Sequence, residues 1–135
     1  MKEICLLLID DRLLRCTFGT ATTVPDSRER WEAIWTYRHA ITDIVHTHPG
    51  NFLGFSEEDR TTMQAVEAGT GQRYTWSIVT LSGYLSKRDE HQFLNRSRPW
   101  WLAPLRLLSF GPTQEERKEN EHVRIDQPDL ARSKR

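Results

Sequence analysis

The sequence has too few cysteines for a disulfide framework and no apolar run long enough to cross a membrane. Two cysteines occur in 135 residues, which excludes the class of small secreted domain that several disulfides hold together. The N-terminal apolar run, residues 4–9, stops at Asp10 and is too short for a secretory signal or for the ~20 residues of a membrane span. We therefore expect a cytoplasmic protein. If Asp10 and Asp11 form a two-residue turn, Cys5 and Cys16 lie opposite each other, and we expect two buried thiols rather than a bridge.

Net charge is absent as well, because 19 basic and 19 acidic residues cancel. No overall field would attract nucleic acid or an anionic membrane, and neither is expected as a partner. The length and the 37% share of apolar residues are sufficient for one domain with a real core. Charge dominates after Gly111 and apolar residues become rare. We therefore predict one domain over residues 1–112 and a charged, flexible tail over 113–135.

The periodicity of apolar residues predicts an alternation of strands and helices. The expected strands are a hairpin over 3–9 and 12–18, then 41–48, 74–81, 84–87 and a short edge strand over 91–96. The expected helices are 28–39 with Asp26 or Ser27 as its cap, 57–68 with Gly69 at its end, and a third after Pro99. The predicted fold class is α/β (α+β), with a single mixed β-sheet flanked by helices.

Five tryptophans occur, and four of them lie in the two expected terminal helices or beside them. Trp31, Ile34 and Trp35 recur at i, i+3 and i+4, so we interpret both tryptophans as packing residues of a core-facing stripe. Trp100 and Trp101 are adjacent and cannot easily both be buried. The last helix therefore either docks on the sheet or presents a surface to a partner or substrate.

The stretch from His46 to Asp59 carries the residues best suited to chemistry. Residues 43–48 alternate, so His46 and His48 fall on one face of a strand that Pro49 ends. Ser56 then begins a helix with Asp59 in its first turn. Two neutral imidazoles and one carboxylate suit zinc with a fourth position left for water, which is typical of catalysis.

Ser56 and Asp59 also have a structural interpretation. A serine followed three residues later by an acidic residue, at the start of a helix, forms a capping box that satisfies free backbone donors. A cap does not require histidines, and His46 and His48 stand just upstream at a matching distance. The combination favours Asp59 as a metal ligand.

The same stretch carries a family resemblance. His46-Thr47-His48-Pro49, then Ser56 and Asp59, resemble position for position the H-x-H-P-x6-S-x2-D signature of JAMM (MPN-plus) zinc metalloproteases, which include deubiquitinating isopeptidases and their bacterial and archaeal relatives. The family also has a glutamate at the start of an N-terminal apolar strand, and Glu3 is similarly placed. The resemblance covers residues 3–87 and implies a cytidine-deaminase-like, JAMM-type fold.

The resemblance implies a zinc-dependent metallopeptidase or isopeptidase that hydrolyses an amide bond at the C-terminus of a ubiquitin-like protein or small peptide conjugate. It implies that His46, His48 and Asp59 bind Zn²⁺ and that Ser56 hydrogen-bonds the oxyanion. Glu3 would take the proton from the attacking water and pass it to the leaving amine. Glu32, on the helix before the metal strand, is the alternative base. The remaining alternative function is a catalytically inactive MPN-type protein-interaction module.

The loop over residues 50–55 is unusually apolar for a segment beside a metal site. Phe52 and Phe55 either line a channel for an extended substrate tail or tuck into the core. The resemblance implies that substrates enter as extended chains ending in small residues such as Gly-Gly. An adenylating enzyme or another partner protein, bound through the Trp100-Trp101 region, is a further expectation. His46 and His48 could also be interpreted as the first metal ligands of an amidohydrolase-type barrel. That interpretation is excluded, because the barrel needs roughly 250 residues.

Overall fold

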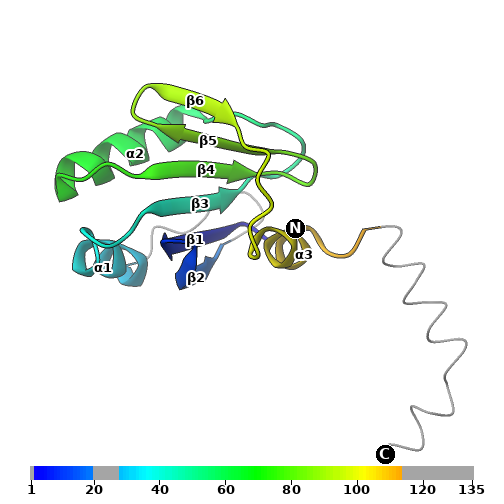
Figure 1. Cartoon of the computed structure of the whole chain (residues 1–135), viewed down its shortest axis with the longest axis horizontal. Coiled ribbons are helices and arrows are strands. Elements are labelled where there is room, and N and C mark those ends of the chain that lie inside the picture. Colours follow the sequence, from blue (N-terminus) through cyan, green and yellow to red (C-terminus); the bar gives the residue numbers. More distant parts are fainter. Residues whose placement is uncertain (1, 20–27, 114–135) are drawn as a thin grey trace, which may run out of the picture.

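The computed structural model describes residues 2–19 and 28–113, and in this part of the chain six strands form one mixed sheet flanked by three helices (Figure 1). The elements are β1 (Ile4–Ile9), β2 (Arg12–Phe18), α1 (Arg28–Thr36), β3 (Asp43–Thr47), α2 (Glu57–Thr70), β4 (Thr75–Val79), β5 (Tyr84–Arg88), β6 (His91–Leu94) and α3 (Leu102–Phe110). The predicted single mixed sheet with flanking helices is confirmed. The expected cap at Asp26 or Ser27 and the expected tail, from residue 114 onward, lie outside the described residues.

The order of strands places the N-terminal strand beside the strand that carries His46. The order is β2-β1-β3-β4-β5-β6, with β3 and β4 parallel and every other neighbouring pair antiparallel. The helix α2 connects β3 to β4, as a crossover must for a parallel pair. The predicted edge strand is confirmed as β6. No helix of the described ranges combines the length and the apolar character that crossing a membrane requires.

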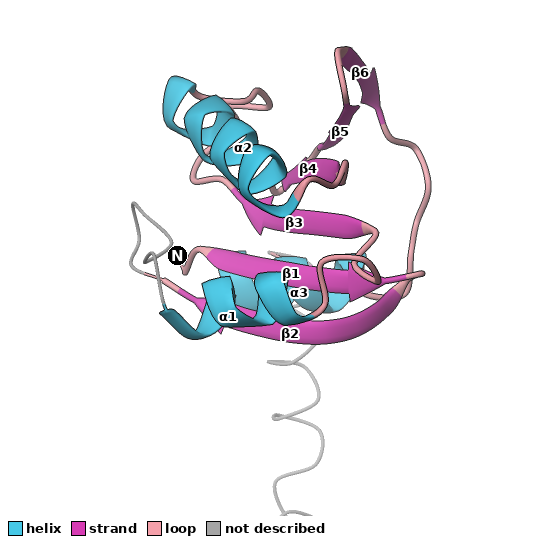
Figure 2. Ribbon diagram, turned by 90° about the vertical axis from the view of Figure 1, so that its left-hand side faces the viewer, coloured by secondary structure: helices cyan, strands magenta, loops and turns pink. Residues whose placement is uncertain are grey.

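The sheet has two covered faces, and Figure 2 shows α1 and α2 on one and α3 on the other. Alternate residues of each strand therefore enter two separate cores. The core of the α1/α2 face is formed by Cys5, Leu7, Ala33, Ile34, Ile41, Ile44, Phe55, Met63, Val66, Tyr74, Trp76, Ile78 and Leu85. The core of the α3 face is formed by Ile4, Leu6, Leu8, Val45, Val79, Trp101, Leu102 and Leu105.

The register of the first hairpin differs from the prediction. A one-residue shift within the β1–β2 ladder places Cys5 opposite Thr17 and Leu6 opposite Cys16. The predicted pairing of the two cysteines is therefore wrong, because a bulge in the hairpin adds a residue that the turn alone does not indicate. Both thiols are free, with Cys5 buried and Cys16 partly buried.

The end of α2 also lies beyond its predicted position. The helix continues through Gly69 to Thr70, and Gly71 adopts the left-handed conformation (φ 71°) and donates its N–H to the carbonyl of Glu67. The expectation that Gly69 ends the helix is wrong, because only the second of the two glycines has the backbone geometry of a C-terminal cap.

The tryptophans of α1 are not core residues. Trp31 and Trp35 are 42% and 47% exposed, whereas Ala33 and Ile34 are buried. The helical spacing places Trp31 and Ile34 on the same side of α1, but the part of α1 that is buried is narrower than predicted. The interpretation of both tryptophans as core packing is wrong.

The C-terminal helix α3 holds the start of the chain in place. Trp101 is 4% exposed and packs on the sheet, while Trp100 is 58% exposed. Both indole N–H groups donate to Asp11, in the first hairpin turn. Trp101 donates to the Asp11 carboxylate at 2.8 Å, and Trp100 donates to the Asp11 backbone carbonyl at 2.7 Å. At the other end of α3, the carbonyl of Ser109 accepts from the N–H of Lys2 at 2.9 Å and its hydroxyl donates to the Lys2 carbonyl. Of the two alternatives for the last helix, the structure shows docking on the sheet, while Trp100 stays exposed.

Candidate metal centre

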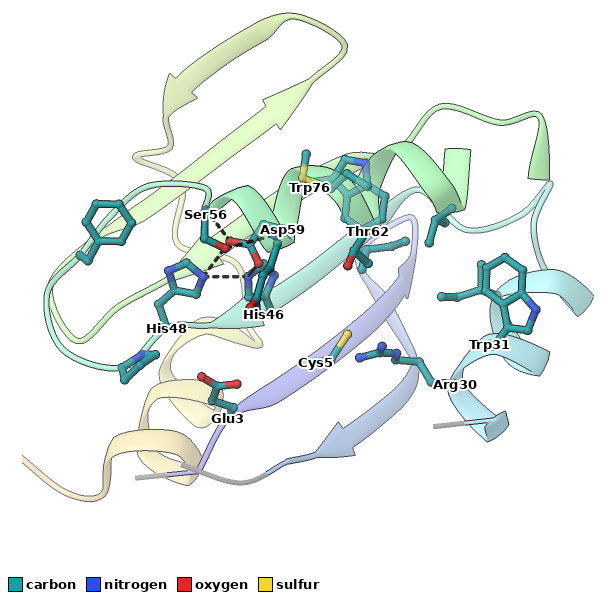
Figure 3. Close-up of a pocket in the computed structure, with 17 residues that line it drawn as sticks. Glu3, Cys5, Arg30, Trp31, His46, His48, Ser56, Asp59, Thr62 and Trp76 are labelled. Carbon is teal, nitrogen blue, oxygen red and sulfur yellow. Dashed lines mark hydrogen bonds and ion pairs between the residues drawn. The ribbon is translucent and has the colours of Figure 1, made fainter. Parts of the chain in front are cut away.

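His46, His48 and Asp59 converge at the C-terminal end of β3 (Figure 3). His46 lies in β3, and His48 continues its line because the backbone N–H of His48 donates to the carbonyl of Val79 at 3.0 Å. Asp59 comes from the first turn of α2. The two imidazole Nε2 atoms are 3.0 Å apart, and the Asp59 oxygens lie 3.2 Å from His46 Nε2 and 3.0 Å from His48 Nε2.

The carboxylate of Asp59 serves the helix and the histidines at the same time. Its Oδ2 accepts from the backbone N–H of Ser56 at 2.8 Å, and the Ser56 Oγ accepts from the Asp59 N–H at 3.1 Å, which completes a capping box. The same carboxylate faces both imidazoles. The cap and the ligand are therefore not alternatives, because capping fixes the rotamer that points Asp59 at His46 and His48.

With Asp59 ionised, no arrangement of protons on the two imidazoles makes all three short contacts favourable. Each Nε2 carries either one hydrogen or one lone pair, and an ionised Asp59 only accepts. If both nitrogens are protonated, two hydrogens oppose each other across the 3.0 Å between His46 and His48. If either nitrogen is unprotonated, its lone pair faces a carboxylate oxygen at 3.0 or 3.2 Å. A cation between the three groups makes every contact attractive, so the donor set fits a metal ion.

The pKa values of the group agree with strong coupling between its members. Burial alone would raise the pKa of Asp59, but hydrogen bonds from His46, His48 and the Ser56 backbone hold that pKa well below its usual range. Burial tends to lower the pKa of His48, but the hydrogen bond and charge of Asp59 outweigh it and the pKa is raised. A hydrogen bond to the backbone of Phe52 adds to this rise and orients the ring.

Glu3 lies next to the group and is held firmly. Cys5 pairs with His46 in the β1–β3 ladder, so the same register places Glu3 across from His48, with its side chain on the same face. The Glu3 carbonyl accepts from the N–H of Gly19 at 2.7 Å, and the residue is 6% exposed. Burial raises the pKa of the Glu3 carboxyl, an effect that His46 and His48 partly offset. A carboxylate with a raised pKa is well suited to accept and release a proton.

The loop after β3 separates the two phenylalanines. Phe55 is buried in the core of the α1/α2 face, and Leu53 packs so closely on Gly83 that a Cβ there would lie 2.6 Å from Leu53 Cδ2. Phe52 is 65% exposed, and its ring stacks on His48 with centroids 6.2 Å apart and planes at 9°. Phe52 therefore stands at the mouth of the site, while Phe55 anchors the loop from within the core.

A pocket of about 500 Å³ opens beside the metal group and extends between α1 and α2. Glu3, His46, His48, Phe52, Ser56 and Asp59 line one end of it. The alternative base Glu32 does not line it and instead pairs with Arg28 at 2.9 Å on the exposed side of α1. The sequence did not indicate the other end, which Arg30, Trp31, Ile34, Thr62, Met63, Val66 and Trp76 line with Cys5 and Ile44. Trp31 could have been found only by knowing which edge of the α1 stripe stays uncovered.

Within the described ranges, no fourth histidine, cysteine or carboxylate joins the three donors, whose ligand atoms all lie within 4.8 Å of one another. A cation held by these three donors alone would keep a coordination position for a further ligand. Neither a scan of protein-family models nor searches of curated proteins and of solved structures find a match to this chain. What the site can do therefore follows from its own side chains.

Proposed function

We propose that this chain is a zinc-dependent metallopeptidase or isopeptidase of the JAMM type, with the corresponding cytidine-deaminase-like fold, that hydrolyses an amide bond of a ubiquitin-like protein or a small peptide conjugate. The observation that carries the proposal is the convergence of three metal donors and one buried, protonatable carboxylate on a pocket. Zinc bonds of roughly 2.0–2.2 Å at tetrahedral angles place donor atoms about 3.3 Å apart. The separations of 3.0–3.2 Å among His46, His48 and Asp59 support that ion and geometry.

The roles of the residues follow from their positions. A zinc ion held by His46, His48 and Asp59 would lower the pKa of a bound water to near ~7 and polarise the substrate carbonyl. Glu3, across the sheet from His48, accepts the proton of the attacking water and delivers it to the leaving amine. The Ser56 Oγ accepts from the Asp59 N–H, so its own hydrogen remains free to donate to the developing oxyanion.

Metal content tests the donor set. Purified wild-type protein should contain about one zinc per chain by mass-spectrometric metal analysis, and His46→Ala should contain almost none. The exposed His39 provides the control, and His39→Ala should retain the ion. Chelation should also lower the melting temperature of the wild type but not of His46→Ala, because a ligand at a hundred times its dissociation constant stabilises by about 2.7 kcal/mol. Equal zinc content in the wild type and His46→Ala would contradict the proposed metal site.

Replacement of the base tests the chemistry separately. Glu3→Gln should keep its zinc but lose about 10²- to 10⁴-fold in turnover of fluorogenic peptide amides. The matched control is Glu32→Gln, which alters an exposed ion pair outside the pocket and should leave turnover unchanged. Undiminished hydrolysis by Glu3→Gln would show that a group other than Glu3 acts as the general base. Zinc binding by the wild type without any amide hydrolysis would instead support the inactive MPN-type interaction module.

A further inference from the structure

The pocket continues well beyond the metal donors along the face of the sheet. Figure 3 shows Trp31 and Arg30 at the end away from Glu3 and His48, with Thr62 and Trp76 between. All these residues line the same cavity of about 500 Å³. This volume is in the range of pockets that enclose whole small ligands.

The stripe of α2 that begins with Asp59 continues into this end of the pocket. Thr62, Met63 and Val66 follow Asp59 at i+3, i+4 and i+7 and line the pocket with it. They therefore share one helix face, and Met63 and Val66 belong to the buried core. A substrate bound at the metal meets this apolar surface immediately beside the reacting centre.

The strands under the pocket also place apolar side chains beside the metal donors. Ile44 is two residues before His46 in β3, so their side chains share a face and lie roughly 7 Å apart along the strand. Trp76 pairs with Ile44 on the neighbouring strand and widens the apolar floor. A single large side chain beside the scissile amide is long enough to reach from the metal donors to Ile44. Arg30 also lines this end of the pocket, and Figure 3 shows its guanidinium directed toward Cys5.

Trp31 stands at the far end of the pocket and approaches the opposite helix. The Trp31 Cη2 lies 3.4 Å from the position that a Cβ on Gly69 would occupy, so the ring approaches α2 where the helix has no side chain. A glycine-only substrate tail would leave this aromatic end unfilled and would forfeit its dispersion contacts.

We propose that this apolar end of the pocket, formed by Trp31, Ile44, Thr62, Val66 and Trp76, binds a large apolar side chain of a residue flanking the scissile amide. The preferred substrates are thus peptides or conjugates with an aromatic or long aliphatic residue there, in place of the Gly-Gly tail implied by resemblance. This specificity rests on the proposed function, because it places the reacting amide at the metal donors.

Paired substrates test the preference. The zinc-loaded protein is assayed on capped fluorogenic peptides that carry phenylalanine, leucine or glycine at each of the two positions flanking the amide. At one of these positions kcat/KM should be about ten- to a hundredfold higher for phenylalanine or leucine than for glycine. Equal rates for all three residues at both positions would overturn the inference while leaving the proposed hydrolase intact.

A matched pair on α2 locates the subsite. Thr62→Trp places an indole in the pocket and should lower kcat/KM for the phenylalanine substrate by about tenfold or more. Thr61→Trp adds the same side chain at the neighbouring exposed position, which does not line the pocket, and should not change it. An equal response of both variants would contradict the assignment.

Binding without turnover separates the two proposals if no amide is hydrolysed. Acetyl-phenylalaninamide should shift the Trp31 indole N–H resonance of the full chain, assigned by its loss in Trp31→Phe, whereas acetyl-glycinamide should not. This measurement needs neither zinc nor activity. A shift with no hydrolysis under any condition would preserve the apolar subsite and reject the peptidase, and the absence of a shift with both compounds would reject the subsite.

Discussion

The two faces of the sheet are lined by the same strands but are filled to different degrees. In β1, Ile4 and Leu6 point into the α3 face, where one helix seals the core. Cys5 points to the opposite face and, with Glu3 before the strand, lines a pocket that α1 and α2 leave between them. The α3 face is a buried core under one helix, whereas the two helices on the other face leave a pocket over part of the sheet.

Polar residues differ between the faces in the same way. Thr47 points to the α3 face, is fully buried, and its Oγ1 accepts from the N–H of Ile4 at 2.9 Å and lies 3.0 Å from the Ser109 hydroxyl. Its partners are thus structural. The flanking His46 and His48 point to the pocket and contact each other and Asp59. The α3 face uses polar groups to fix the backbone, and the α1/α2 face gathers them at the pocket.

The largest expected effect is a loss of stability from a substitution in the core of the α3 face. Leu105→Ala removes a side chain that is 2% exposed in the α3 face and should lower the free energy of unfolding by about 2–5 kcal/mol. Trp31→Ala removes more atoms, but at a half-exposed pocket wall, and should cost less. Urea denaturation measures both, with Leu108→Ala on the exposed side of α3 as the control. A larger loss for Trp31→Ala would mean that the α1/α2 face is the better packed of the two.

An intermediate effect is expected where the closed face supports the reactive one. Ser109→Ala removes the hydroxyl that joins α3 to Lys2, the residue before Glu3. Stability should fall by about 1 kcal/mol. Zinc content should be unchanged, and kcat should fall about ten- to a hundredfold, because a small displacement of a catalytic group is costly. Ser97→Ala, at an exposed position away from Glu3, is the matched control. Unchanged kcat in Ser109→Ala would show that Glu3 is positioned without α3.

The smallest effects come from the two glycines at the end of α2. Gly69→Ala should stabilise the protein by about 0.5–1 kcal/mol, because the position is helical and the added methyl makes an ordinary contact with Trp31. Gly71→Ala should destabilise it by about 1 kcal/mol, because φ is 71° there. Thermal unfolding of both variants gives the comparison. Destabilisation by Gly69→Ala would show that the space beside Trp31 is too small for a methyl group.

The donors of the site were predictable because they are local in sequence. His46 and His48 share a strand face by alternation, and the helix start at Ser56 fixes Asp59 through its cap. These relations depend on short spacings and on capping geometry, both of which a sequence displays directly. The strands and helices were predictable for the same reason.

The features that were not predictable depend on tertiary structure. Helical spacing groups Trp31 with Ile34 but does not indicate how much of that stripe a sheet covers, so the pocket wall was mistaken for core. The bulge that separates Cys5 from Cys16 lies within the strand pair, between Leu7 and Leu8, where the turn residues do not indicate it. Phe52 and Phe55 have equal apolar character, and only the path of the loop decides which one is buried.

The contact between Lys2 and Ser109 joins positions 107 residues apart. On a ribosome that adds ~5–20 residues per second, Glu3 is synthesised roughly 5–20 seconds before Ser109. The three donors proposed for a metal ion are therefore synthesised before the helix that holds the segment around Glu3. Under the proposed function, full hydrolytic activity would therefore arise only after α3 has docked.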